Sequence, residues 1–117
     1  MNDTIVISTE LIGQQCIVMA LTGRFDAASA SALKDAFKET IGGGVTRVVV
    51  DMAEVSFIDS AGLSALITAQ KMTRAIGGRL VACNLPPQAS AVFELTKLDQ
   101  TVGLYPTRQA AIAAVTD

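Results

Sequence analysis

Two hydrophobic segments near the start of the chain differ in pattern and together predict a hairpin. Over residues 4–11 apolar and polar residues are interspersed, which indicates a half-exposed edge strand. After a turn at residues 13–15, the apolar run Cys16–Leu21 favours a strand that is covered on both faces. Strands joined by so short a turn are typical of a hairpin, and a loop is expected over residues 22–26.

Three further segments predict the rest of a sheet. Residues 46–51 (TRVVVD) are the most β-prone part of the chain and indicate a central strand. We expect residues 52–57 to form a connector. Short strands are expected over Arg79–Cys83 and Val102–Tyr105.

The first two helices are predicted by apolar residues at helical spacing. Asp26 is suited to cap the first helix, because its carboxylate can accept hydrogen bonds from the unpaired amides of the first turn. The glycines at 42–44 follow this helix and precede a strand, so they are expected to end the helix rather than to bind phosphate. The second helix follows Ile58–Gly62 (IDSAG) and ends near Ile76.

Two more helices are expected in the last third of the chain. One begins near Pro87, runs to about Lys97 and has an inner face of Val92, Leu95 and Thr96. The other follows Pro106. The residues expected on the inner face of this last helix are Ala110, Ala111, Ala114 and Val115.

The resulting order, β-β-α-β-α-β-α-β-α, predicts an α/β fold of residues 1–117 as one domain, which suits a chain of 117 residues. Strands that alternate with helices form a mostly parallel sheet, here of four to five strands with about four helices. Binding sites in such sheets gather beyond the carboxyl ends of the strands. The loops that hold Asp26 and Asp59-Ser60 are expected at such ends.

Composition excludes several classes of function. There is no histidine, which removes imidazole bases and most zinc sites. The net charge of −2 offers no basic surplus for nucleic acid, and no tryptophan is present for base stacking. The carboxylates of Asp26, Asp51, Glu54 and Asp59 have no partner base, and there is no GxGxxG or P-loop motif. We therefore expect no catalytic residue, no metal and no cofactor.

The same sequence suggests where the protein acts. Cys16 and Cys83 lie far apart in apolar runs and are expected to be buried, reduced thiols. The start of the chain lacks the features of a signal peptide, and no apolar run is long enough to cross a bilayer. A cytoplasmic protein without membrane insertion is expected.

Asp59-Ser60, just before the second helix, admits two interpretations. Either side chain could simply cap the helix by accepting amide hydrogens. Alternatively, the loop is a docking or modification site, because a helix N-terminus stabilises added negative charge and a neighbouring carboxylate opposes it. Leu63 and Ile67 follow on one line of the helix and likewise either tuck under a neighbouring element or form an exposed patch for a partner.

The segment from Val49 to Leu63 (VVDMAEVSFIDSAGL) resembles the signature of STAS domains, which sulfate transporters and anti-sigma factor antagonists share. Residues 21–26 (LTGRFD), residues 77–81 (GGRLV) and the segment from Val92 to Leu98 also fit this family. The resemblance covers nearly the whole chain and implies the STAS fold.

It also implies a regulator rather than an enzyme. Anti-sigma factor antagonists bind an anti-sigma factor that is also a serine kinase, and the sigma factor is then released. The kinase inactivates the antagonist by phosphorylating the loop, and a PP2C-type phosphatase restores it. The residues at positions that match the binding surface are Asp26, Asp59, Ser60, Ala61, Gly62, Leu63 and Ile67.

This chain departs from the family pattern at one position. The family's phosphorylated residue stands just before the glycine of the loop, and here that residue is Ala61, which has no hydroxyl. Three interpretations follow: the protein escapes inactivation by the kinase, Ser60 serves as a substitute acceptor, or the protein belongs to a branch that phosphorylation does not control.

Two other functions remain as alternatives at this point. The first is a STAS regulatory subunit of a membrane transporter for phospholipids or anions. The second, an enzyme or nucleotide-binding domain, has the weakest support because the chain lacks histidine and a phosphate-binding loop.

Overall fold

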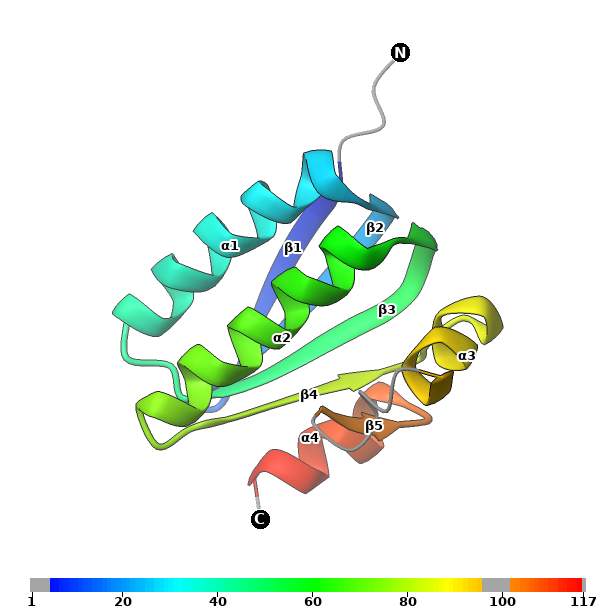
Figure 1. The fold of residues 1–117 in the computed structure, drawn as a ribbon. Coiled ribbons are helices and arrows are strands. Elements are labelled where there is room, and N and C mark those ends of the chain that lie inside the picture. The colour runs from blue at the N-terminus through cyan, green and yellow to red at the C-terminus, as the bar shows by residue number, and fades with distance from the viewer. Residues whose placement is uncertain (1–4, 96–101, 117) are drawn as a thin grey trace.

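A five-stranded sheet organises the computed structural model, which describes residues 5–95 and 102–116 (Figure 1). The strands are β1 Val6–Ile12, β2 Cys16–Phe25, β3 Arg47–Ile58, β4 Arg79–Cys83 and β5 Gly103–Tyr105. The helices are α1 Ala27–Gly42, α2 Ser60–Ala75, α3 Pro87–Leu95 and α4 Arg108–Thr116. The strands lie in the order β1-β2-β3-β4-β5, and only β1 runs antiparallel to its neighbour. The predicted α/β class and mostly parallel sheet are confirmed.

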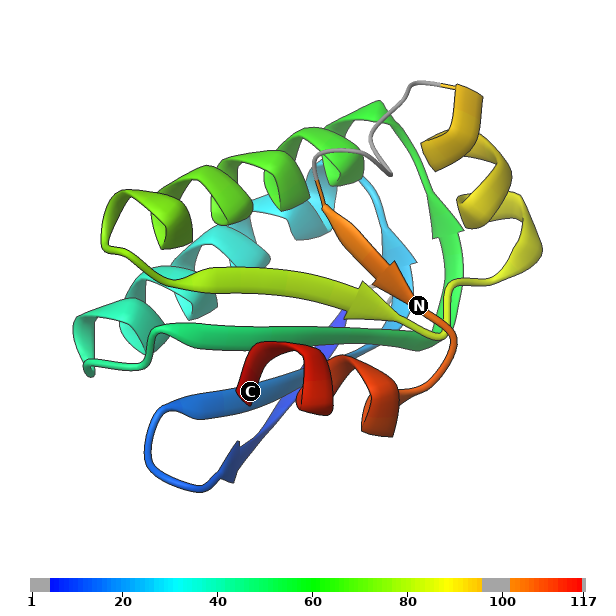
Figure 2. The ribbon, with the colours of Figure 1, turned by 90° about the horizontal axis from the view of Figure 1, so that it is seen from below.

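Helices cover the two faces of the sheet unequally. Figures 1 and 2 show α1 and α2 side by side on one face and α4 on the other, while α3 lies beyond the carboxyl end of β3. The main core, between the sheet and the α1–α2 layer, contains the largest fully buried side chains: Phe25, Phe37, Phe93, Met19, Leu21, Leu33, Met52 and Leu66. A smaller core under α4 contains Cys16, Val18, Val49, Val81, Cys83, Ala111 and Val115.

Two segments that we expected to be irregular belong to strands. Residues 22–25 continue β2, and residues 52–57 continue β3, because the two strands remain paired as far as Phe25 and Ile58. The pairing passes through register shifts between Ala20 and Thr22 and between Gly23 and Arg24. Such irregularities admit glycine and polar residues that weaken the β pattern in the sequence, so the prediction ended both strands too early.

The inner face predicted for α3 is also wrong in part. Leu95 is 83% exposed, and the buried residues of α3 are Ala89 and Phe93. Val92, also predicted on the inner face, is partly buried and packs against the main core together with them, so the misplaced residue is Leu95. Thr96, Lys97 and Leu98 lie outside the described residues.

The buried carboxylate of Asp51 joins β3 to the loop after β4 and to α4. It accepts hydrogen bonds from Asn84 Nδ2 at 3.1 Å, from the amide of Ala53 at 3.1 Å and from Arg108 Nε at 2.9 Å. Burial alone would raise the pKa of Asp51. The hydrogen bonds from Asn84, Ala53 and Arg108, with the charge of Arg108, outweigh burial and hold the pKa below its usual value.

Stability should therefore depend on the ionisation of Asp51. Because its pKa is lower in the folded state, its contribution is complete above the unfolded value of about 3.9 and is lost as the pH falls through the folded value. We expect Asp51→Asn to reduce the free energy of unfolding at pH 7 by about 1–2 kcal/mol. The loss between pH 7 and pH 3 should then be smaller than in the wild type. Urea titrations at both pH values measure the difference, and equal acid losses would contradict this role.

Candidate functional site

Two helix N-termini meet at the carboxyl ends of β2 and β3. Phe25 and Ile58, the last residues of these strands, are register partners, so the residues that follow them, Asp26 and Asp59, lie at the same edge of the sheet. The amide of Asp59 donates a hydrogen bond to the carbonyl oxygen of Phe25 at 3.3 Å and ties the two loops together. The expectation that both loops follow the carboxyl ends of strands is confirmed.

Asp26 caps α1 through a closed set of hydrogen bonds. Its Oδ1 accepts from the amides of Ala28 at 3.1 Å and Ser29 at 3.2 Å, and Ser29 Oγ accepts from the amide of Asp26 at 2.8 Å. Partial burial raises the pKa of Asp26, but hydrogen bonds from Ser29, Arg24 and Ala28 outweigh it and lower the pKa overall. The carboxylate is thus ionised and fixed in position at neutral pH.

Asp59 caps α2 with a single bond, from the amide of Gly62 to Oδ1 at 3.0 Å. The capping interpretation of Asp59 is confirmed by this contact. Next to it, Ser60 is exposed and Ala61 is half-buried. The start of α2 therefore offers solvent a carboxylate, a hydroxyl and a methyl group on consecutive residues.

Gly62 lets α2 approach β2 closely. A Cβ atom at this position would lie 2.3 Å from the carbonyl oxygen of Phe25 and 3.1 Å from Ile58 Cγ1. The first turn of α2 would have to move away from the end of β2 to admit any side chain at this position. The glycine thus holds the first turn of α2 against the end of β2 and fixes the distance between the two loops.

The line of residues that follows the loop on α2 is largely covered by the rest of the protein. Leu63 is only 8% exposed and belongs to the main core, so it offers a partner little surface. Ile67 is half-buried and packs against the same core. Gln70, further along, is 5% exposed, and among the residues that the structure describes its Oε1 has no hydrogen-bond partner. Of the two interpretations that the sequence left open, tucking under neighbouring elements holds for Leu63, and Ile67 is partly buried in the same way.

Arg24 and Phe57 belong to this edge, although the sequence did not single them out as site residues. The two are register partners at the ends of β2 and β3. The Arg24 guanidinium lies over the Phe57 ring, 4.2 Å from its centre, and Arg24 Nε lies 3.4 Å from Asp26 Oδ2. The signal was available, since Arg24 lies inside the LTGRFD segment, but the pairing of two distant residues across strands is not visible in a linear sequence.

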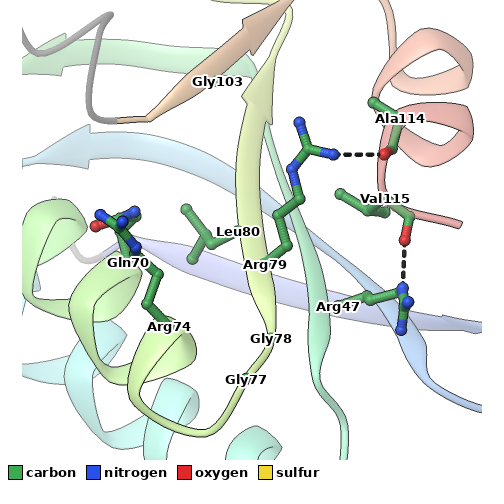
Figure 3. Close-up of a pocket in the computed structure, with 10 residues that line it drawn as sticks. All are labelled: Arg47, Gln70, Arg74, Gly77, Gly78, Arg79, Leu80, Gly103, Ala114 and Val115. Carbon is green, nitrogen blue, oxygen red and sulfur yellow. Dashed lines mark hydrogen bonds between the residues drawn. The ribbon is translucent and has the colours of Figure 1, made fainter. Parts of the chain in front are cut away.

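A hollow of about 590 Å³ lies at the opposite edge, among the amino ends of β3 and β4 and the last turns of α2 and α4 (Figure 3). Two of the arginines that line this hollow bind the C-terminal end of α4. Arg47 Nε donates to the carbonyl of Val115, and Arg79 donates to the carbonyl of Ala114 at 2.8 Å and to the Tyr105 hydroxyl at 3.2 Å. Cations that satisfy the last carbonyls of a helix stabilise its C-terminus. We therefore assign these arginines to the docking of α4.

The described part of the chain has few groups that could react as nucleophiles or bind a metal ion. Within residues 5–95 and 102–116, no group of three or more potential ligands could hold a metal ion. Cys16 and Cys83 are free and buried, as predicted, and burial, with the nearby charge of Asp51, raises the pKa of Cys83 to about 12. Among the helices so described, none has the length and apolar character required to span a bilayer.

Comparisons with known proteins agree on one family. The model of the STAS domain matches residues 8–111. BtrV of Bordetella bronchiseptica, a proposed anti-sigma factor antagonist, is 32% identical over 98 residues that cover 84% of each chain. The anti-sigma-F factor antagonist RsfB of Mycobacterium tuberculosis is 29% identical over 84% of this chain and 80% of its own. The crystal structure of an anti-sigma factor antagonist from Mycobacterium paratuberculosis superposes with a TM-score of 0.85 at 28% identity, covering 100% of this chain and 98% of that one.

Proposed function

The chain belongs to the STAS domain family, and from that premise we propose that it is an anti-sigma factor antagonist. It binds an anti-sigma factor that is also a serine kinase, acts through partner switching, and thereby frees a sigma factor for transcription. It is a regulator and not an enzyme. The observation that carries the proposal is the similarity to stand-alone antagonists over most of their length as well as most of this chain.

The docking surface that we propose is the edge formed by the two capped helix N-termini. It comprises the Asp26 loop and the first turn of α2, from Asp59 to Gly62, with Ile67 at its border. Leu63 supports this surface from beneath, because it is buried in the core. Asp26 and Asp59 are both held by backbone amides, so they offer a partner fixed negative charges. A fixed surface loses little conformational entropy on binding.

Regulation by phosphate is altered in this protein. We infer that position 61 is the usual acceptor position of the family, and a methyl group there cannot be phosphorylated. The protein then remains competent to bind in the presence of its kinase and ATP. Ser60 is exposed and is the substitute acceptor to be tested, with a PP2C-type phosphatase as the enzyme that would reverse its modification. We place the protein in the cytoplasm, where sigma factors act.

The test is complex formation with the serine-kinase anti-sigma factor of the same organism, measured by isothermal titration calorimetry and by displacement of the bound sigma factor. We expect a one-to-one complex and release of the sigma factor as antagonist is added. If neither occurs, and the chain instead copurifies with a membrane permease complex, the proposal is wrong and the transporter-subunit alternative is right.

Restoring the hydroxyl should restore kinase control. After incubation with the kinase and ATP, we expect Ala61→Ser to carry one phosphate per chain at position 61 and to lose affinity for the kinase. An anion added beside Asp59 is repelled by that carboxylate and changes the charge that the partner meets. Intact-protein and peptide mass spectrometry measure the modification. Wild-type protein is the matched control, and stoichiometric phosphate on its Ser60 would contradict the unmodified state that we infer.

A further inference from the structure

Arg24 holds a positive charge in a fixed position at the carboxyl ends of β2 and β3, where Asp26 and Asp59 supply negative charges. Its guanidinium is stacked on Phe57 at 4.2 Å, and its Nε contacts Asp26 Oδ2 at 3.4 Å. Two contacts on different sides of one planar group restrict its rotation. The side chain nevertheless remains 43% exposed, so the group is held in place while open to solvent.

The two terminal nitrogen atoms of Arg24 are the unused part of this group. Within the described residues they donate no hydrogen bond, since the contact with Asp26 uses Nε. The ion pair with Asp26 is long and partly exposed, and pairs of this kind contribute little to folding stability. Asp26 is moreover held by two helix amides without the help of Arg24. The contacts of Arg24 with Phe57 and Asp26 therefore add little to the folding stability of this chain, and another role is needed to explain them.

A guanidinium with both terminal amino groups available matches a carboxylate, which accepts two parallel hydrogen bonds from it. Arginine is also enriched in protein interfaces, where stacking on an aromatic ring reduces the entropy lost on binding. Arg24 lies at the same sheet edge as Asp26 and Asp59, so a protein that docks on these residues meets it as well.

We propose that Arg24, held by Phe57 and Asp26, is a specificity-determining residue that binds an acidic side chain of the anti-sigma factor. This inference rests on the proposed function, because it names the chemistry of one contact within that docking surface. The proposed docking surface then carries both signs of charge, with the Arg24 guanidinium beside the Asp26 carboxylate and the Asp59 carboxylate on the neighbouring loop. A partner must offer the complementary order of charges, which excludes anti-sigma factors that lack an acidic group at this point.

The experiment compares the dissociation constants of four variants for the anti-sigma factor. We expect Arg24→Gln to weaken binding about tenfold and Arg24→Glu about 100-fold, because the second variant places a negative charge against the partner's carboxylate. Phe57→Leu should weaken binding about threefold, since it keeps the charge and removes the ring that orients it. Arg74→Glu, which reverses an exposed arginine in the last turn of α2, is the matched control and should bind like the wild type.

Thermal melts of all four variants separate binding from folding. We expect Arg24→Gln and Phe57→Leu to melt near the wild type. The two charge reversals should melt slightly lower, because Arg24→Glu faces Asp26 and Arg74→Glu opposes the dipole at the C-terminus of α2, so binding is compared at a temperature where every variant is folded. A compensating exchange completes the test: one acidic residue of the anti-sigma factor, changed to lysine, should recover affinity for Arg24→Glu. The inference is overturned if Arg24→Glu binds within threefold of the wild type while a change at Asp59 abolishes the complex. If wild-type protein forms no complex at all, the proposed function itself has failed.

Discussion

Replacing Gly62 by alanine is expected to lower the free energy of unfolding by about 2–4 kcal/mol. The added Cβ would lie 2.3 Å from the carbonyl oxygen of Phe25, which is backbone and cannot rotate away. The first turn of α2 must then move off β2, and two buried side chains must move with it: Leu63, the next residue, and Leu66, one turn further on. The intrinsic gain of about 1 kcal/mol from replacing glycine in a helix is too small to offset this.

The matched control is Gly42→Ala at the last residue of α1. A Cβ there meets no atom within 4 Å, and its backbone is not left-handed, so this variant should be neutral or stabilising by up to about 1 kcal/mol. Urea unfolding followed by circular dichroism measures both changes. If Gly62→Ala is as stable as Gly42→Ala, the close approach of α2 to β2 described above is incorrect.

Reversing the charge of Asp59 should have the largest effect on binding. We expect Asp59→Lys to weaken the complex with the anti-sigma factor at least about 100-fold, or about 2.7 kcal/mol. The substitution removes a fixed negative charge from the proposed docking surface and replaces it with a positive one. It also removes the cap on Gly62 and opposes the helix dipole, so a loss of stability of about 1–2 kcal/mol accompanies it.

Asp59→Asn separates the effect of the charge on binding from the effect of the cap on stability. Asparagine caps helices about as well as aspartate, so this variant keeps the bond to Gly62 and loses only the charge. We expect native stability and roughly tenfold weaker binding, measured by calorimetry at a temperature where circular dichroism shows every variant to be folded. Wild-type affinity in both Asp59→Asn and Asp59→Lys would place the partner on another surface.

Elements whose stability is local were predictable from the sequence. Asp26 and Asp59 precede helical apolar patterns, and a helix cap depends on a side chain and amides within three residues of each other. The same holds for the end of α1, where the amide of Gly43 bonds to the carbonyl of Glu39 at 3.0 Å. Buried strands such as Arg79–Cys83 were equally visible, because burial on both faces requires an uninterrupted apolar run.

Features that depend on pairing between distant residues were not predictable. Thr22 and Glu54 extend β2 and β3 only because each strand supplies the other's hydrogen bonds past the register shifts. The position of the Asp26 and Asp59 loops after the carboxyl ends of strands was predictable, but Arg24 and Phe57 were missed because their contact crosses two strands. Helical periodicity likewise could not decide whether Leu63 is exposed or covered, whereas the structure buries it where Gly62 lets α2 approach β2.

The burial of both thiols should make the folded protein unreactive toward thiol-labelling reagents. Cys16 and Cys83 are shielded by the core beneath α4, and burial raises the pKa of each thiol. Thiolate is the species that reacts with maleimides, so neither native side chain should be labelled while the protein is folded. A single cysteine introduced in place of exposed Ser60 would accept a fluorophore selectively and report on the arrival and departure of a partner in real time.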